Sequence, residues 1–149
     1  MKVLMVCLGN ICRSPLAHGI MKELAPHHWI VDSAGTSGWH EGERPDTRSV
    51  ITARKHGLDI DHQRSRPVIV DDFYEFDVIF AMDSSNYTNL MNMAPNEEAK
   101  SKVRLIMNEL QPGKNIQVPD PYTGGDEGFE LVYEMLDNSI RKFLEKNLA

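Results

Sequence analysis

A cysteine and an arginine lie at a spacing that suits phosphate chemistry in residues 7–13, Cys-Leu-Gly-Asn-Ile-Cys-Arg. The pair alone is a weak signal, but its setting is specific. An apolar run precedes Cys7, and Gly9 and Asn10 tolerate positive φ. Ser14 and Pro15 then follow as an expected helix N-cap and a proline at the first helical position. Because a helix N-terminus directs N–H groups toward one centre, residues 7–13 are predicted to form an anion-binding phosphate loop.

The phosphate loop also offers a nucleophile. Arg13 supplies a planar guanidinium whose donors match two oxygens of a phosphate-like dianion. The field that holds an oxyanion also stabilises a thiolate at Cys7, and the Ser14 hydroxyl can donate a hydrogen bond to it. A thiolate that faces a bound phosphoryl group can displace the ester oxygen and form a cysteinyl-phosphate. The alternative is a buried structural cysteine with Arg13 on a helix surface.

A second segment, the acid loop at residues 118–125, is the candidate source of the proton that a leaving oxygen needs. It places Asp120 between two prolines and is followed by Tyr122 and two glycines. Prolines stiffen a loop and glycines permit a sharp turn. Asp before Pro is also a common turn dipeptide, so a structural role for Asp120 stays open on these grounds.

Composition favours one folded domain over residues 1–149. The chain carries a formal net charge of −6, with 41% hydrophobic and 26% charged residues, which excludes a disordered chain. An acidic balance argues against nucleic acid as a partner, and no apolar run reaches the roughly 18 residues of a membrane span. With two cysteines and no secretory signal at the N-terminus, a cytoplasmic location is expected.

Apolar segments alternate with helical patterns along the chain. Strands are expected at residues 2–6, 29–33, 77–81 and 103–107, and helices at 14–24, 46–56, 84–93 and from about 127 onward. This alternation predicts an α/β fold with a parallel sheet and helices on both faces. Ligands bind at the carboxyl ends of the strands in such sheets, so the phosphate loop after the first strand is the expected site.

Residues 6–15, together with Asp120-Pro121-Tyr122, resemble the low-molecular-weight protein tyrosine phosphatases. Residues 32–35, Trp39, residues 82–86 and the terminal helix also match, so the resemblance spans essentially the whole chain. It implies a single domain with a four-stranded parallel sheet. It also implies hydrolysis of protein phosphotyrosine and of aryl phosphates through a cysteinyl-phosphate, with no cofactor and no metal.

The resemblance assigns the catalytic roles. Cys7 is the nucleophile, Arg13 the phosphate clamp, and Asp120 the acid that protonates the leaving phenol and then activates water. Supporting roles fall to residues that hold or tune the phosphate loop. These are Leu8, Gly9, Asn10, Ile11, Cys12, Ser14 and His62. His62 lies at the position of a histidine that braces the phosphate loop in the resembling family. Asp83 and Asn86 fall in a motif that supports the site from the third strand.

Trp39 and Tyr122 match the aromatic walls that grip a phosphotyrosine ring in the resembling family. A tryptophan is otherwise more often a packing residue. Ile11 is expected at the floor or rim of the substrate pocket. The arginine phosphatases that resemble this chain carry threonine at that place, so the apolar Ile11 favours a phenyl ring over a guanidinium.

Cys12 has two interpretations. It can be a small packing residue of the phosphate loop. By resemblance it is a resolving thiol that captures Cys7 after oxidation, which would make Cys7 a redox-sensitive cysteine.

Other functions fit the residues less well. A thiol-dependent arsenate reductase needs two further cysteines, and only Cys12 remains. A non-catalytic phosphate-binding module would lack the nucleophile or the acid, and a zinc site would need ligands beyond one cysteine pair. Among hydrolases, a protein-arginine phosphatase is the nearest rival. The expected partners are a tyrosine-phosphorylated protein and phosphate-like oxyanions, and the expected assembly is a monomer or a weak dimer.

Overall fold

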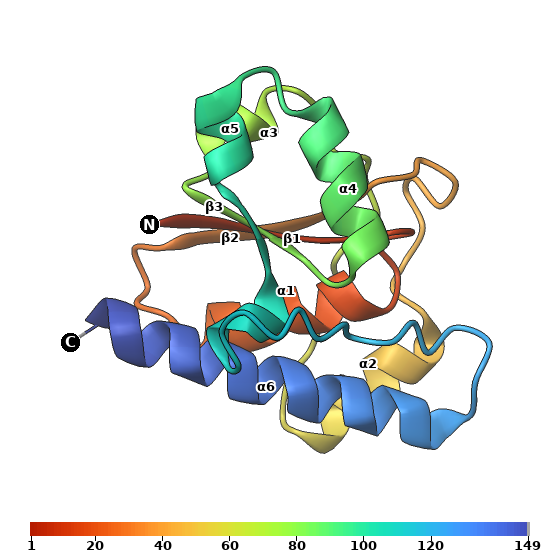
Figure 1. Cartoon of the computed structure of the whole chain (residues 1–149). Coiled ribbons are helices and arrows are strands. Elements are labelled where there is room, and N and C mark those ends of the chain that lie inside the picture. Colours follow the sequence, from red (N-terminus) through yellow and green to blue (C-terminus); the bar gives the residue numbers. More distant parts are fainter. Residues whose placement is uncertain (149) are drawn as a thin grey trace.

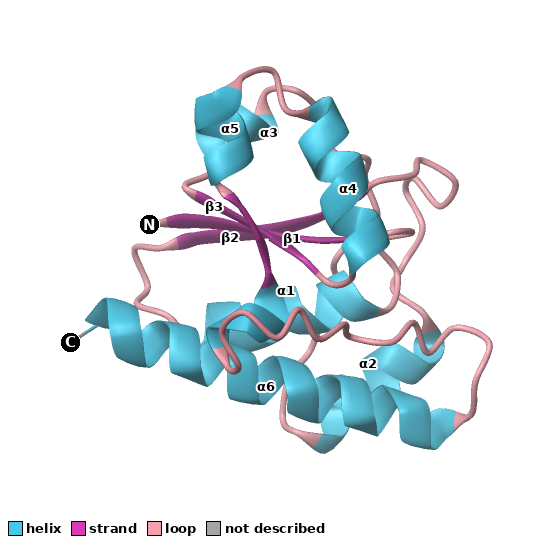
Figure 2. Cartoon of the chain, viewed as in Figure 1, coloured by secondary structure: helices cyan, strands magenta, loops and turns pink. Residues whose placement is uncertain are grey.

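The computed structural model describes residues 1–148 and contains a parallel sheet with the strand order β2-β1-β3-β4. Its strands are β1 (Lys2–Cys7), β2 (Ile30–Gly35), β3 (Val78–Ala81) and β4 (Val103–Leu105). Its helices are α1 (Arg13–Leu24), α2 (Thr47–Lys55), α3 (Asp72–Glu75), α4 (Ser84–Met93), α5 (Glu97–Ser101), the 3-10 helix η1 (Ile106–Glu109) and α6 (Asp126–Leu148). The predicted four-stranded parallel α/β fold is confirmed (Figures 1 and 2).

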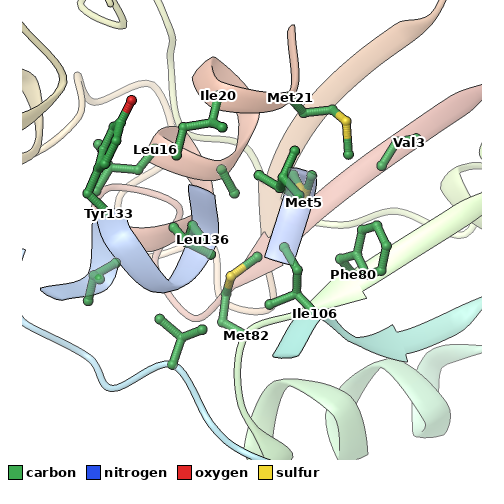
Figure 3. Close-up of a cluster of buried hydrophobic side chains, with 14 of the residues drawn as sticks. Val3, Met5, Leu16, Ile20, Met21, Phe80, Met82, Ile106, Tyr133 and Leu136 are labelled. Carbon is green, nitrogen blue, oxygen red and sulfur yellow. The ribbon is translucent and has the colours of Figure 1, made fainter. Parts of the chain in front are cut away.

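The helices form two layers around the sheet. Helices α1, α2 and α6 lie on one face, and α3, α4 and α5 lie on the other (Figure 1). Side chains of β1 alternate between the two cores: Val3, Met5 and Cys7 join the α1–α6 side, whereas Leu4 and Val6 join the opposite side. Figure 3 shows the larger core, in which residues of α1 and α6 meet those of β1 and β3. This packing fixes where β1 ends, and so where the phosphate loop begins.

The start of α1 differs from the prediction. The helix begins at Arg13, with Cys12 at the N-cap position and no side-chain cap, so the expected cap by Ser14 is wrong. Ser14 instead lies within the first turn and is fully buried. A side-chain cap would occupy helix N–H groups that an anion can otherwise use. The uncapped start therefore agrees with an anion-binding loop better than the predicted one does.

Short elements account for the other differences. The fourth strand ends at Leu105, and residues 106–109 continue as η1 rather than as strand. Helices α3 and α5, with four and five residues, were not predicted, because a helical period cannot be recognised in one turn.

The residues directly after β2 hold the start of the phosphate loop by backbone hydrogen bonds. Thr36 N and Ser37 N donate to the carbonyls of Cys7 and Leu8 at 2.9 and 3.0 Å. These bonds bring the backbones so close that a Cβ placed on Gly35 would lie 2.7 Å from the Leu8 carbonyl oxygen. Glycine is therefore required at residue 35 by the approach of another backbone.

Replacement of that glycine tests the contact. We expect Gly35→Ala to lower the free energy of unfolding by about 1–3 kcal/mol, since backbone atoms must move to admit the methyl group. Gly38→Ala is the matched control, because its added Cβ would meet only Pro67 Cβ at 4.0 Å. Urea denaturation of both variants checks this, and equal stability of the two would contradict the close contact.

Candidate active site

A cavity of about 180 Å³ lies at the carboxyl end of β1. The phosphate loop, the segment after β2 and the acid loop all contribute to it. Its lining residues are Cys7, Leu8, Gly9, Ile11, Cys12, Arg13, Trp39, His40, Asp120 and Tyr122. Segments more than 100 residues apart in the sequence thus meet at one cavity, as the two motifs predicted.

The Cys7 sulfur lies beside a hydroxyl group that a second hydrogen bond orients. Cys7 Sγ lies 3.1 Å from Ser14 Oγ, and the Asn10 side-chain amide donates to the same hydroxyl oxygen at 2.7 Å. Because the amide occupies a lone pair of that oxygen, the hydroxyl hydrogen is free to point at the sulfur. The arrangement suits a thiolate at Cys7, which accepts hydrogen bonds and donates none.

Asn10 also maintains the backbone of the phosphate loop. Its φ is 56°, a left-handed conformation that asparagine tolerates better than most residues. Its amide donates to Ser33 Oγ at 3.1 Å, and its carbonyl accepts from the backbone N of Arg66 at 3.1 Å. The loop is therefore anchored to β2 and to the segment after α2 through one side chain.

Arg13 is buried, with 2% of its surface exposed, and only part of its guanidinium is bonded within the protein. Nη1 donates to Asp83 Oδ2 at 2.7 Å and to the Val118 carbonyl at 3.0 Å. Nε is buried and has no hydrogen-bond partner among residues 1–148. Burial alone would lower the pKa of Arg13, but the charges of Cys7, Asp83 and Asp120 raise it. A permanent cation thus lines the cavity with one edge anchored and one edge unbonded.

Asp120 lies across the cavity from Arg13. Its Oδ2 is 3.7 Å from Arg13 Nη2, and its Oδ1 accepts a hydrogen bond from Tyr122 N at 3.1 Å. The side chain is 44% exposed, so protons can exchange with water. A carboxyl group in this position can exchange a proton with a group bound in the cavity.

Aromatic groups surround the opening. Trp39 and Tyr122 are exposed, by 79% and 48%, and His40 lies near them with its ring 6.4 Å from that of Tyr122. His40 also contacts the phosphate loop, since a Cβ on Gly9 would lie 3.0 Å from its ring. This histidine was missed because nothing in its sequence neighbourhood sets it apart from a loop residue.

The described residues give two further negative findings. Within residues 1–148, no group of three or more His, Cys, Asp or Glu side chains is arranged to hold a metal ion. No helix in the described part of the chain is both long and apolar enough to cross a membrane.

Comparison with known proteins agrees with this geometry. The family model described as low molecular weight phosphotyrosine protein phosphatase matches residues 2–149. The chain belongs to this family. A relative from Schizosaccharomyces pombe, named low molecular weight phosphotyrosine protein phosphatase, is 40% identical over 97% of this chain and 95% of its own.

Solved phosphatase structures also match this chain. A protein tyrosine phosphatase from Entamoeba histolytica, with Hepes in its active site, matches at a TM-score of 0.92 with 41% identity, over 99% of this chain and 97% of its own. A Drosophila arginine phosphatase matches at a TM-score of 0.93 with 36% identity and covers 100% of this chain and 99% of its own. The phosphatase fold therefore extends over the whole described chain.

One residue carried over from this family does not lie where it was predicted. His62 is exposed and lines a separate cavity beside α1, with no hydrogen bond to the phosphate loop among the described residues. Its neighbour Gln63 is buried and donates to the Pro15 carbonyl at 3.1 Å. Among the described residues, His62 therefore does not brace the phosphate loop by a hydrogen bond, in contrast to the prediction.

Residues that sequence reasoning left out provide that support. Ser65 Oγ donates to the Gly9 carbonyl at 3.0 Å, and Ser33 receives the Asn10 amide. Arg66, which presents its backbone N to Asn10, is held by Asp32 and Asp72 at 2.9 and 3.0 Å. Ser33 and Ser65 lie far from the phosphate loop in the sequence, so no local pattern predicts these contacts.

Cys12 differs from Cys7 in its surroundings. It is buried and packs with Ile11 and Phe129, and its carbonyl accepts from Ser49 Oγ at 3.2 Å. Burial raises the pKa of the Cys12 thiol, and the charge of Asp46 raises it further. Burial and this charge therefore favour the protonated thiol of Cys12 over its thiolate.

Proposed function

We propose that this protein hydrolyses phosphotyrosine in proteins, and aryl phosphates, through a cysteinyl-phosphate. The observation that carries the proposal is the meeting of three groups at one cavity: Cys7 Sγ beside the Ser14 hydroxyl, the unbonded edge of Arg13, and the Asp120 carboxyl 3.7 Å from that guanidinium. A nucleophile, a phosphate clamp and an acid are the parts that this reaction requires.

The first step transfers the phosphoryl group to sulfur. The backbone N–H groups of the phosphate loop and the free edge of Arg13 hold the phosphate oxygens. The Cys7 thiolate attacks phosphorus in line with the ester oxygen, and the phosphorus–oxygen bond breaks. Asp120 gives its proton to the departing phenol oxygen, and the phosphoryl group remains on Cys7.

The second step restores the enzyme. Asp120, now a carboxylate, accepts a proton from a water molecule while the oxygen of that water molecule attacks phosphorus. The phosphorus–sulfur bond breaks, the electron pair returns to Cys7, and inorganic phosphate leaves. The hydrogen bond from the Ser14 hydroxyl stabilises the thiolate as leaving group, just as it stabilises the nucleophile.

The cavity walls support phosphotyrosine as the substrate. Trp39 and Tyr122 stand at the opening, where they can pack on a phenyl ring, and Ile11 adds an apolar surface inside. The short stem of phosphoserine cannot span these walls to reach Cys7. Both cysteines are free thiols, which suits the reducing cytoplasm as the place of action.

The role of Asp120 predicts a dependence on the leaving group. We expect Asp120→Asn to lower kcat/KM for phosphotyrosine peptides by about 10²–10⁴-fold, the usual range for a general acid. A nitrophenyl phosphate should lose less in its phosphorylation step, because nitrophenolate departs with little protonation. Steady-state kinetics over a series of aryl phosphates measures this.

Cys7→Ser serves as the control for this series. It should hydrolyse none of the esters yet bind vanadate, because the backbone and Arg13 form the anion site. Equal losses for all leaving groups in Asp120→Asn would assign the acid to another residue. Substantial turnover by Cys7→Ser would refute the nucleophile.

The Drosophila arginine phosphatase makes phosphoarginine the second candidate substrate, because its structure matches this chain over the whole length. Ile11 argues against it. The residue is buried in contact with Cys12 and Phe129 and lines the cavity, and its side chain offers no hydrogen bond. A polar group that loses water without gaining a partner is rejected strongly, whereas a methyl group is worth only about 1–3 kcal/mol.

Ile11→Thr tests this discrimination. We expect the unmodified protein to prefer phosphotyrosine over phosphoarginine and the variant to shift the kcat/KM ratio toward phosphoarginine, since its hydroxyl can bond a guanidinium. Ile51→Thr, on an exposed part of α2, is the matched control and should leave the ratio unchanged. Faster phosphoarginine hydrolysis by the unmodified protein would reverse the substrate assignment while leaving the nucleophile in place.

We also propose that Cys7 is redox-sensitive and that Cys12 is its resolving thiol. Peroxide oxidises the Cys7 thiolate to a sulfenic acid. The Cys12 sulfur then attacks the Cys7 sulfur, its proton and the sulfenic hydroxyl leave as water, and a disulfide forms. Because burial raises the pKa of Cys12, its thiol is not itself readily oxidised, and it loses its proton only as its sulfur attacks Cys7.

Mild oxidation tests the pair. We expect peroxide to inactivate the enzyme, dithiothreitol to restore it, and phosphate to protect it. In Cys12→Ser the same exposure should leave inactivation that thiols reverse poorly, because the sulfenic acid proceeds to higher oxides. Peptide mapping that finds no bond between Cys7 and Cys12 in the oxidised protein would contradict the proposal.

A further inference from the structure

The acid loop is held at both of its ends by arginine side chains. On the side before Asp120, Arg13 Nη1 donates to the Val118 carbonyl at 3.0 Å. On the side after it, Arg48 donates to the carbonyls of Tyr122 and Gly124, at 2.7 and 3.1 Å. Asp120 lies between these anchors, on a segment without helix or strand structure. Its distance from the phosphate loop therefore depends on both.

Arg48 is itself held in a defined geometry. Arg48 Nε and Nη2 donate to the two carboxylate oxygens of Asp46, both at 3.1 Å. Partial burial by itself would raise the pKa of Asp46, but these hydrogen bonds hold the pKa below its usual range, so the pair stays ionised. The guanidinium also lies over the Phe129 ring, 4.6 Å from its centroid. A planar fork with these partners has little freedom to rotate.

The same pair is tied to the phosphate loop. Asp46 N donates to the Ile11 carbonyl at 2.7 Å, and Phe129, beneath the guanidinium, packs against Ile11 and Cys12. The start of α2 thus bonds the phosphate loop through Asp46 and the acid loop through Arg48. No direct hydrogen bond joins the acid to the nucleophile among residues 1–148, so this bridge, with Arg13, sets their separation.

We propose that Arg48 is a positioning residue that holds Asp120 at the distance from the phosphate loop that proton transfer requires. This inference rests on the proposed function of Asp120. Arg48 does not line the cavity, so it acts through the carbonyls it bonds and not on the substrate. Misplacement of a catalytic group by about 1 Å can lower a rate by about 10²-fold, so loss of the anchor has a measurable effect.

Arg48→Gln tests the proposal, with Arg54→Gln as the matched control. Arg54 lies on the same helix, is 59% exposed, and among residues 1–148 forms an ion pair with Asp61 and none with the acid loop. We expect Arg48→Gln to lower kcat/KM for phosphotyrosine peptides by about 10–100-fold and for nitrophenyl phosphate by much less. The inhibition constant of inorganic phosphate should not change, because Arg13 and the phosphate loop are intact. Arg54→Gln should change none of these values.

A double-mutant cycle with Asp120→Asn separates positioning from a structural role. If Arg48 acts through Asp120, its replacement costs no further activity when residue 120 is Asn. An equal loss in both backgrounds, or a weaker phosphate inhibition in Arg48→Gln, would overturn the proposal. Should Arg48→Gln unfold, Arg48→Lys keeps the charge without the fork and should give a smaller loss with the same leaving-group dependence.

The cycle also distinguishes this inference from the proposed function. If the proposed function fails, the unmodified protein does not hydrolyse phosphotyrosine or Asp120→Asn shows no leaving-group dependence. If only this inference fails, those results stand and Arg48→Gln behaves like Arg54→Gln.

Discussion

A buried guanidinium is the interaction on which the arrangement of the site depends. An arginine with 2% exposure would lose several kcal/mol of hydration free energy without compensation, so a stable fold must place acceptors around it. Those acceptors come from the loop after β3, through Asp83, and from the acid loop, through the Val118 carbonyl. Because Arg13 begins α1 directly after the phosphate loop, satisfying this one cation brings together three segments that are distant in sequence.

The same region leaves several polar groups without partners inside the protein. Arg13 Nε is unbonded among the described residues, and α1 begins without a side-chain cap. In an ordinary core such groups would destabilise the fold, and selection would replace or bond them. Here Arg13 lines the cavity and α1 begins beside it, so these groups are donors next to one cavity. In the proposed reaction a phosphate would accept hydrogen bonds from these donors, which the free protein leaves without protein partners.

The features that could be read from the sequence are those set by local rules. The continuous apolar run of β1, the Gly-Asn pair of the phosphate loop and the long amphipathic pattern of α6 each predict their structure from residues that are neighbours in the sequence. The site contacts that the sequence did not predict join residues that are distant in the sequence and close only in the folded protein. His40 and Ser65 reach the phosphate loop only after the chain folds back, and no sequence pattern separates the exposed His62 from the buried Gln63 that bonds α1.

Charge in this protein is local, and that explains how an acidic chain binds an anion. The net charge is −6, and both arginines near the site are paired, Arg13 with Asp83 and Arg48 with Asp46. The long-range field therefore contributes little attraction for a phosphate ester, and salt screens it further. Binding must come from short-range donors: the backbone N–H groups of the phosphate loop and the free edge of one guanidinium. Such donors act only on a group that fits between them, so their geometry selects a phosphate group over anions of other shapes.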